Sequence, residues 1–270
     1  MTAVNYEAEL QHYQRHGWCK FAFDDELYRW VKHVLPSAAN CLTRKENEHW
    51  WRYQDTWFVG VNALPNDASG AVDGGPRLSG TAQRFMQQLG LSTNQLDRAQ
   101  ISTCFPGYPK VAKGESKALH LYRLNRDAAH IDGLLREGPE RHRFAREYHE
   151  YILLIPMNDF EIGASPFVAW NGSHLLMKKA LTAAFNGVAK EQWANTPITE
   201  PYIEARKQVF EQCTRLELDL KVGEAVLAHR MLLHGTAPWR PTAKTSEHGR
   251  MLCFFRPQTL TIEQWLQNLY

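Results

Sequence analysis

The chain has 270 residues, enough for one domain with a sizeable core, and its 44% hydrophobic and 22% charged residues exclude general disorder. Its 31 basic residues nearly balance 29 acidic ones, so we expect no nucleic-acid partner. There is neither a run of 18 apolar residues nor a secretory signal, so we expect no membrane partner. Five scattered cysteines without a C-x-x-C pair predict buried thiols in a reducing compartment, and hence a cytoplasmic protein.

Residues 1–95 are predicted to form a helical and irregular support. A helix is expected over 6–17, ending at Gly17, followed by a strand over 18–23. A second helix follows, with Asp24 or Asp25 as its N-cap, because apolar residues recur three and four positions apart. The Gly, Pro, Asn and Asp content of 62–80 predicts a long loop.

Short apolar runs separated by turns continue through 96–258 and predict the β core. Strands are expected at 100–105, 118–124, 150–156, 166–170, 225–229 and 251–255. Residues 175–216 have helical spacing and predict an insertion over one end of the barrel. We therefore expect a single domain over 1–270, mainly β with flanking helices, arranged as an antiparallel sandwich or small barrel.

Two segments contain candidate metal ligands. His130 and Asp132 stand two residues apart, so on an extended strand both side chains point to one face. A later turn and apolar strand lead to His234, which is followed by Gly235 and Thr236. Two histidines and one carboxylate on one face leave positions open on an iron ion for a cosubstrate and O2.

A candidate anion-binding cation follows these segments. Arg250 opens the last predicted strand, where its guanidinium could hold the far carboxylate of a dicarboxylic acid.

Together, the His-x-Asp-Gly motif, the His-Gly-Thr segment at 234–236 and the downstream arginine resemble the Fe(II)/2-oxoglutarate-dependent oxygenases, specifically the phytanoyl-CoA dioxygenase-like superfamily. Residues 166–174 and 12–18 resemble further segments of that group. The resemblance implies a double-stranded β-helix of the jelly-roll or cupin kind. It also implies that His130, Asp132 and His234 ligate Fe(II), and that no other catalytic residue is required.

The resemblance implies that Arg250 and Thr236 bind 2-oxoglutarate. The loop before the arginine is longer here than in relatives, so Arg256 and Arg240 stay open as alternatives to Arg250.

The activity implied is oxidation of a small molecule, coupled to O2 and to decarboxylation of 2-oxoglutarate to succinate and CO2. Related halogenases replace the carboxylate ligand with a small residue, so Asp132 favours hydroxylation. The alternatives are a cupin-like metalloenzyme that does not use 2-oxoglutarate and a non-catalytic small-molecule-binding protein on the same scaffold.

Other aromatic, basic and histidine residues are candidates for the cavity wall or for the core. Tyr122 and Arg123, on the strand predicted to lead to His130, and Trp170 are candidates for lining the substrate cavity. His229 lies five residues before His234, an odd number, so we expect it to face away from the metal. The other tryptophans, Trp57 among them, are expected to be core or interface residues.

Overall fold

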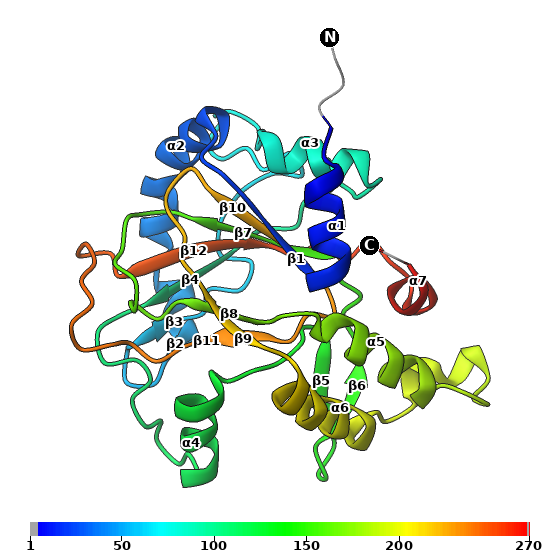
Figure 1. Ribbon diagram of the computed structural model, residues 1–270. Coiled ribbons are helices and arrows are strands. Elements are labelled where there is room, and N and C mark those ends of the chain that lie inside the picture. Colours follow the sequence, from blue (N-terminus) through cyan, green and yellow to red (C-terminus); the bar gives the residue numbers. More distant parts are fainter. Residues whose placement is uncertain (1–4, 269) are drawn as a thin grey trace.

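The computed structural model describes residues 5–268 and 270, and Figure 1 shows a large β-sheet with helices on its outer side and a smaller sheet opposite. The helices are α1 (Glu7–His16), α2 (Asp25–Cys41), α3 (Thr81–Gln88), α4 (Lys117–Arg126), α5 (Ser173–Ala184), α6 (Thr199–Gln212) and α7 (Ile262–Gln267), with 3-10 helices at Lys45–Trp50 and Lys190–Asn195. The strands are β1 (Trp18–Phe21), β2 (Trp51–Arg52), β3 (Trp57–Phe58), β4 (Gln100–Cys104), β5 (Leu134–Glu137), β6 (His142–Ala145), β7 (Tyr151–Pro156), β8 (Phe167–Trp170), β9 (Arg215–Leu218), β10 (Ala225–His229), β11 (His234–Thr236) and β12 (Arg250–Phe255).

All strand pairs are antiparallel, and they form two principal sheets. The large sheet has the order β1-β10-β7-β12-β4-β3-β2, the smaller one has the order β11-β8-β9, and β5 and β6 form a separate hairpin. This is the mainly β jelly roll with flanking helices that the sequence predicts. The part of the chain before residue 96 contributes β1, β2 and β3 to the large sheet in addition to its helices.

Alternate residues of the large sheet enter two different cores. On β12, Leu252 packs with Ile152 of β7 and Phe167 of β8 between the two sheets. The next residue, Cys253, faces outward into the core that the sheet shares with α2 and α3. This alternation follows from the period of two along a strand, and it also sets which β12 residues face the interior of the barrel.

Helix α2 starts where its sequence predicts. The Asp24 side chain accepts hydrogen bonds from the backbone N–H groups of Glu26 and Leu27 and thereby caps the helix. Its second oxygen accepts from the backbone N–H and the hydroxyl of Thr81, at the start of α3. A single carboxylate therefore joins the two helices that cover the outer face of the large sheet.

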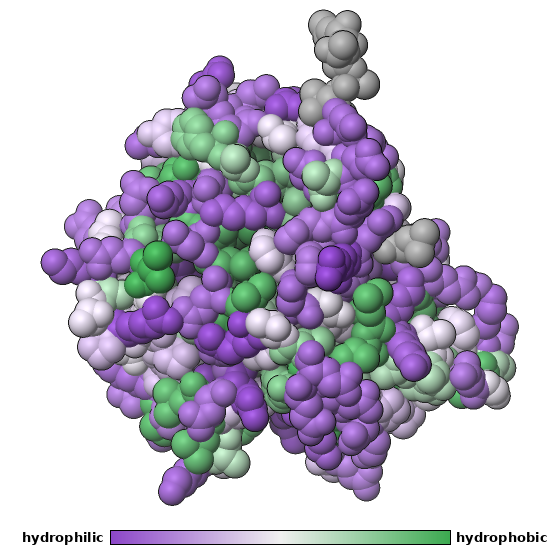
Figure 2. All heavy atoms as spheres, in the orientation of Figure 1, coloured by the Kyte–Doolittle hydropathy of each residue, from purple (hydrophilic) through white to green (hydrophobic). Residues whose placement is uncertain are grey.

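One predicted strand is wrong. Residues 118–124 lie in helix α4, which Ser116 caps by accepting a hydrogen bond from the N–H of Leu119. The apolar residues that suggested a strand are exposed leucines on this helix, and Figure 2 shows apolar residues gathered over α4 at the lower left. The spacing of apolar residues over 118–124 suggested a half-buried strand, but this segment is a helix without buried residues.

The helical insertion is present as α5, a 3-10 helix and α6, but α6 ends at Gln212, and Arg215 and Leu216 of the predicted range belong to β9. All five cysteines are free thiols, and four of them are buried, Cys213 being only partly so. None of the helices within residues 5–268 combines the length and the hydropathy that a membrane crossing requires.

Candidate metal centre

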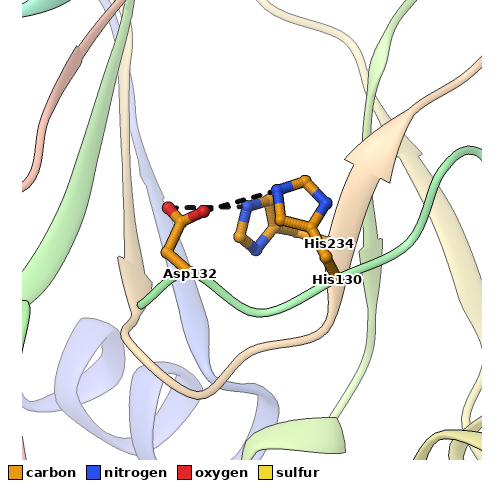
Figure 3. Close-up of side chains that lie close together, drawn as sticks. All are labelled: His130, Asp132 and His234. Carbon is orange, nitrogen blue, oxygen red and sulfur yellow. Dashed lines mark ion pairs between the residues drawn. The ribbon is translucent and has the colours of Figure 1, made fainter. Parts of the chain in front are cut away.

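Three side chains from two distant segments converge inside the barrel mouth: His130, Asp132 and His234 (Figure 3). Their candidate ligand atoms all lie within 4.8 Å of one another. The Nε2 of His130 is 3.3 Å from Oδ1 of Asp132, and the Nε2 of His234 is 3.9 Å from Oδ2. Two nitrogens and a carboxylate so arranged are the donor set of a non-haem iron site.

The backbone brings the two histidines together. His130 and His234 form an antiparallel bridge in which each N–H donates to the other residue's carbonyl, at N–O distances of 2.8 and 3.0 Å. His130 is thus extended at a single bridge and not within a regular strand, yet it presents its side chain on the same face as Asp132.

A glycine next to each ligand segment permits this close approach. A Cβ on Gly235 would lie 2.2 Å from the carbonyl oxygen of Asp127, and a Cβ on Gly133 would lie 2.1 Å from that of Glu147. Gly133 also has a φ of +83°, which side chains other than glycine rarely adopt. Lack of space for a Cβ therefore explains why the His-x-Asp-Gly and His-Gly motifs have glycine at positions 133 and 235.

Backbone carbonyls set the orientation of both imidazoles. The Nδ1 of His130 lies 2.9 Å from the carbonyl oxygen of Ala128, and the Nδ1 of His234 lies 3.0 Å from that of Leu232. Since a carbonyl only accepts, Nδ1 carries the proton in each ring, and in the neutral ring Nε2 keeps its lone pair. Both Nε2 atoms lie on the side of the Asp132 carboxylate, so their lone pairs are available to an ion bound by all three side chains.

Charge and burial set the protonation states. Burial raises the pKa of Asp132, but the charge of Arg256 and the neighbouring imidazoles outweigh it and hold that pKa well below its usual value. Burial and the neighbouring His130 lower the pKa of His234 to about 4. Burial lowers the pKa of His130, while the hydrogen bond and charge of Asp132 raise it more, so the net shift is upward. At neutral pH the carboxylate is ionised and His234 is neutral, the forms that bind a metal ion.

A pocket opens onto the three ligands. Its wall is aromatic and aliphatic, from Trp57, Tyr108, Phe167, Phe254, Val59 and Val61. Polar wall groups are Gln100, Ser102, Thr236 and Arg256. The wall therefore combines apolar surface with few convergent polar groups, as ligand sites do.

The three candidate arginines lie in different surroundings. Arg240 is half-exposed and paired with Glu217, and Arg256 donates to Asp132 at 3.0 Å. Arg250 is fully buried, and in the described part of the chain no carboxylate pairs with it. Its Nη2 meets the thiol of Cys104 at 3.1 Å, and its Nε and Nη1 have no partner.

Arg250 lies beside the pocket. It shares the inward face of β12 with Phe254, and Cys104 shares the inward face of β4 with Ser102; both Phe254 and Ser102 line the pocket. Burial raises the pKa of Tyr108, another wall residue, well above its usual value, and the positive charge of Arg250 opposes part of this rise. A buried guanidinium with unpaired nitrogens fits an anionic ligand, because an uncompensated charge is costly to bury.

Three predicted cavity residues lie elsewhere. Tyr122 and Arg123 are on α4, where the Tyr122 hydroxyl donates to the carbonyl of Ala129 and Arg123 pairs with Glu115. Trp170 is on β8 and packs against Phe210 of α6. Within residues 5–268 and 270, none of the three lines the pocket.

His229 is likewise separate from the ligands. It lies on β10, where its Nδ1 accepts from the backbone N–H of Met231 and its ring packs near His174.

The wall residues Trp57, Tyr108 and Gln100 were not predicted from the sequence. No local pattern marks Trp57 and Tyr108 as pocket residues. Phe254 could have been found, because it has the same strand parity as Arg250.

No protein-family model matches the chain, and no curated protein is similar to it in sequence. Similar solved structures include the non-haem alpha-ketoglutarate-dependent carbocyclase SnoK from nogalamycin biosynthesis, at 10% identity and a TM-score of 0.48 over 93% of this chain and 83% of that one. EctD from S. alaskensis matches at 13% identity and a TM-score of 0.48, over 94% and 77% of the two chains. AviO1 from Streptomyces viridochromogenes Tue57 matches at 12% identity and a TM-score of 0.41, over 97% and 99%.

EctD has also been solved with iron and with 2-oxoglutarate and 5-hydroxyectoine. At such low identities and TM-scores, the function of this chain has to be inferred from its own residues.

Proposed function

We propose that this protein is a non-haem Fe(II)- and 2-oxoglutarate-dependent oxygenase in which His130, Asp132 and His234 ligate the iron. The observation that supports this best is the combination of a preorganised His-Asp-His site with a buried, unpaired Arg250 beside the same pocket. A metal site alone is compatible with many chemistries. The unpaired cation specifies an anionic cosubstrate in addition.

Each residue then has a distinct task. Arg250 binds the far carboxylate of 2-oxoglutarate through its two unpartnered nitrogens, which would relieve the cost of its burial. Thr236 lines the pocket two residues beyond His234 and offers its hydroxyl to the same carboxylate. When bound, the iron supplies O2 activation coupled to decarboxylation of 2-oxoglutarate to succinate.

The outcome that we propose is hydroxylation of a small molecule. Asp132 occupies the ligand position that related halogenases leave empty for chloride, which favours oxygen insertion over halogenation. Arg256 in the pocket wall pairs with Asp132, Arg250 beside the pocket is assigned to the cosubstrate, and the other polar wall groups, Gln100, Ser102 and Thr236, are neutral. We therefore propose that the part of the substrate that enters the pocket is uncharged, and that the aromatic wall excludes water from it.

An anaerobic spectroscopic titration tests the proposal. Adding Fe(II) and 2-oxoglutarate to the protein should produce a weak visible metal-to-ligand charge-transfer band, which His130→Ala and Asp132→Ala should abolish. Absence of the band from folded wild-type protein would overturn the proposal.

The arginine assignment needs its own comparison. Arg250→Met should weaken 2-oxoglutarate binding by about tenfold or more, because one charge-assisted bidentate pair is lost. Arg240→Met, which removes the same charge from a half-exposed ion pair, serves as the matched control and should bind 2-oxoglutarate normally. The reverse ranking would move the cosubstrate anchor to Arg240.

Succinate formation separates the alternatives. A cupin-like metalloenzyme of another kind would bind the metal without consuming 2-oxoglutarate. A non-catalytic binding protein would bind small molecules without consuming O2. Iron-dependent conversion of 2-oxoglutarate to succinate by wild type, lost in His234→Ala, contradicts both alternatives.

A further inference from the structure

Arg256 contacts Asp132, one of the proposed metal ligands, and the purpose of this contact remains to be assigned. It follows directly after β12, and its Nη1 lies 3.0 Å from Oδ2 of Asp132. Both side chains are largely buried, with 15% and 9% of their surface exposed. A charge pair at this depth is sensitive to the loss of either partner.

The backbone of Arg256 is held from two sides. Its N–H donates to Oδ1 of Asp97 at 2.8 Å, and its carbonyl oxygen accepts from Nδ1 of His149 at 2.7 Å. His149 is in turn placed by Glu147, whose carboxylate lies 3.1 Å from Nε2. The guanidinium therefore projects toward Asp132 from a fixed base and not from a free strand end.

The two oxygens of Asp132 are divided among its neighbours. Oδ2 accepts from Arg256 at 3.0 Å and lies 3.9 Å from Nε2 of His234, whereas Oδ1 faces Nε2 of His130 at 3.3 Å. From this division we infer that Arg256 is a positioning residue of the metal centre: it holds one oxygen of Asp132 so that the other is presented to the ion. The inference depends on the metal site of the proposed function.

Arg256 does not help to attract the metal ion, because its positively charged guanidinium repels a divalent cation. Its benefit is orientation: hydrogen bonds to the far side of a ligand fix its geometry, and losing one typically weakens metal binding about 10–100-fold. Arg256 is the residue that provides this bond to Asp132 within the described chain.

Cobalt(II) binding, followed in the visible region without 2-oxoglutarate, measures the effect without any turnover. Arg256→Met should raise the dissociation constant for Co(II) about 10–100-fold and change the ligand-field spectrum, because the freed carboxylate can rotate. Arg256→Lys keeps a charged donor and should restore part of the affinity and a spectrum closer to wild type. If Arg256→Met does not fold, as judged by circular dichroism and thermal unfolding, Arg256→Gln, which removes the charge and shortens the side chain, provides the comparison, and a wild-type spectrum with wild-type affinity in Arg256→Gln then overturns the inference.

Arg250→Met is the control, since it removes another arginine whose side chain is buried, at the start of β12, where it does not contact Asp132. It should leave the Co(II) affinity and spectrum unchanged and impair only 2-oxoglutarate binding. A wild-type spectrum and affinity in folded Arg256→Met, or tighter Co(II) binding, would overturn the positioning role.

The two proposals fail in different ways. If His130→Ala binds Co(II) as wild type does, the metal site itself is wrong and both proposals fall. If binding requires His130 but is indifferent to Arg256, only the positioning role falls.

Discussion

At the residue scale, Gly133 shows how a motif position can be dictated by its surroundings. It directly follows the candidate ligand Asp132, adopts a positive φ, and faces the Glu147 carbonyl oxygen so closely that no side chain fits. A side chain here would have to displace either the ligand segment or the segment that leads to His149. The glycine thus connects local backbone geometry to the position of Asp132.

A pair of glycine variants isolates this contact. Gly133→Ala should destabilise the protein by more than the cost of about 1–2 kcal/mol of a left-handed alanine, and should also weaken Co(II) binding. Gly138→Ala is the control, because Gly138 has a similar φ of +72° but a Cβ added there would meet nothing within 4 Å. Urea unfolding and metal titration of both variants give the comparison; equal losses of stability with intact metal binding would contradict it.

The residues of the site differ in how far sequence alone could find them. His130, Asp132 and His234 stand in recognisable spacing, and the structure brings them together. Trp57 and Tyr108 reach the pocket only because separate segments of the fold meet there. Such long-range proximity leaves no period or spacing in the sequence, so it could not be predicted.

At the scale of elements, Asp24 links the start of α2 to the start of α3. Burial raises its pKa, but hydrogen bonds from Thr81, Leu27 and Glu26 lower it more, so the net pKa lies below its ordinary value. A carboxyl whose pKa is depressed by folding stabilises the protein above its unfolded pKa of about 3.9. This stabilisation is lost as the pH falls through the lower, folded pKa.

Asp24→Asn should therefore cost about 1–2 kcal/mol of unfolding free energy at pH 7 and progressively less as the pH falls below about 4. Urea unfolding at pH 7 and at pH 3 measures this difference. Asp25→Asn removes the same charge one residue away, from an exposed side chain in the first turn of α2, and should have the smaller effect. A pH-independent cost would show that the carboxylate charge does not contribute.

Among the elements, burial decides which were predictable. Strands such as β7 and β12 carry continuous or alternating apolar residues because both their faces are buried, so their composition marks them. Helix α4 has no buried residue, so burial does not select a helical spacing of apolar residues along it, and the spacing of two between Leu119 and Leu121 arises by chance. Ser116, which caps α4, is the residue that indicates a helix here.

At the scale of the whole molecule, the large sheet separates a supporting core from a functional interior. Phe255 points outward and contacts Trp30 of α2, while its neighbour Phe254 points inward and lines the pocket. Adjacent residues of one strand thus have different roles: Phe255 packs in the core under α2, and Phe254 lines the pocket. Stability and ligand binding should be separable by strand parity.

Two substitutions of the same chemistry test this separation. Phe255→Leu should cost about 1–3 kcal/mol of stability, because a fully buried ring leaves a cavity, and should leave the Fe(II)/2-oxoglutarate band in place. Phe254→Leu should cost less stability and shift the affinity for 2-oxoglutarate or the band position. Chemical unfolding and the anaerobic titration distinguish them, and a reversal of the two patterns would show that the sheet does not divide these roles.

The backbone bridge between His130 and His234 has a further consequence, which concerns chain connectivity. Strands β5 to β10 and the helical insertion all lie between these two residues in sequence, yet backbone hydrogen bonds join the two ends of this long excursion of the chain. The exposed turn of the β5–β6 hairpin lies within the excursion. Because sheet pairing holds both fragments, we expect a protease cut in that turn, or new termini placed there by circular permutation, to leave the three candidate metal ligands assembled.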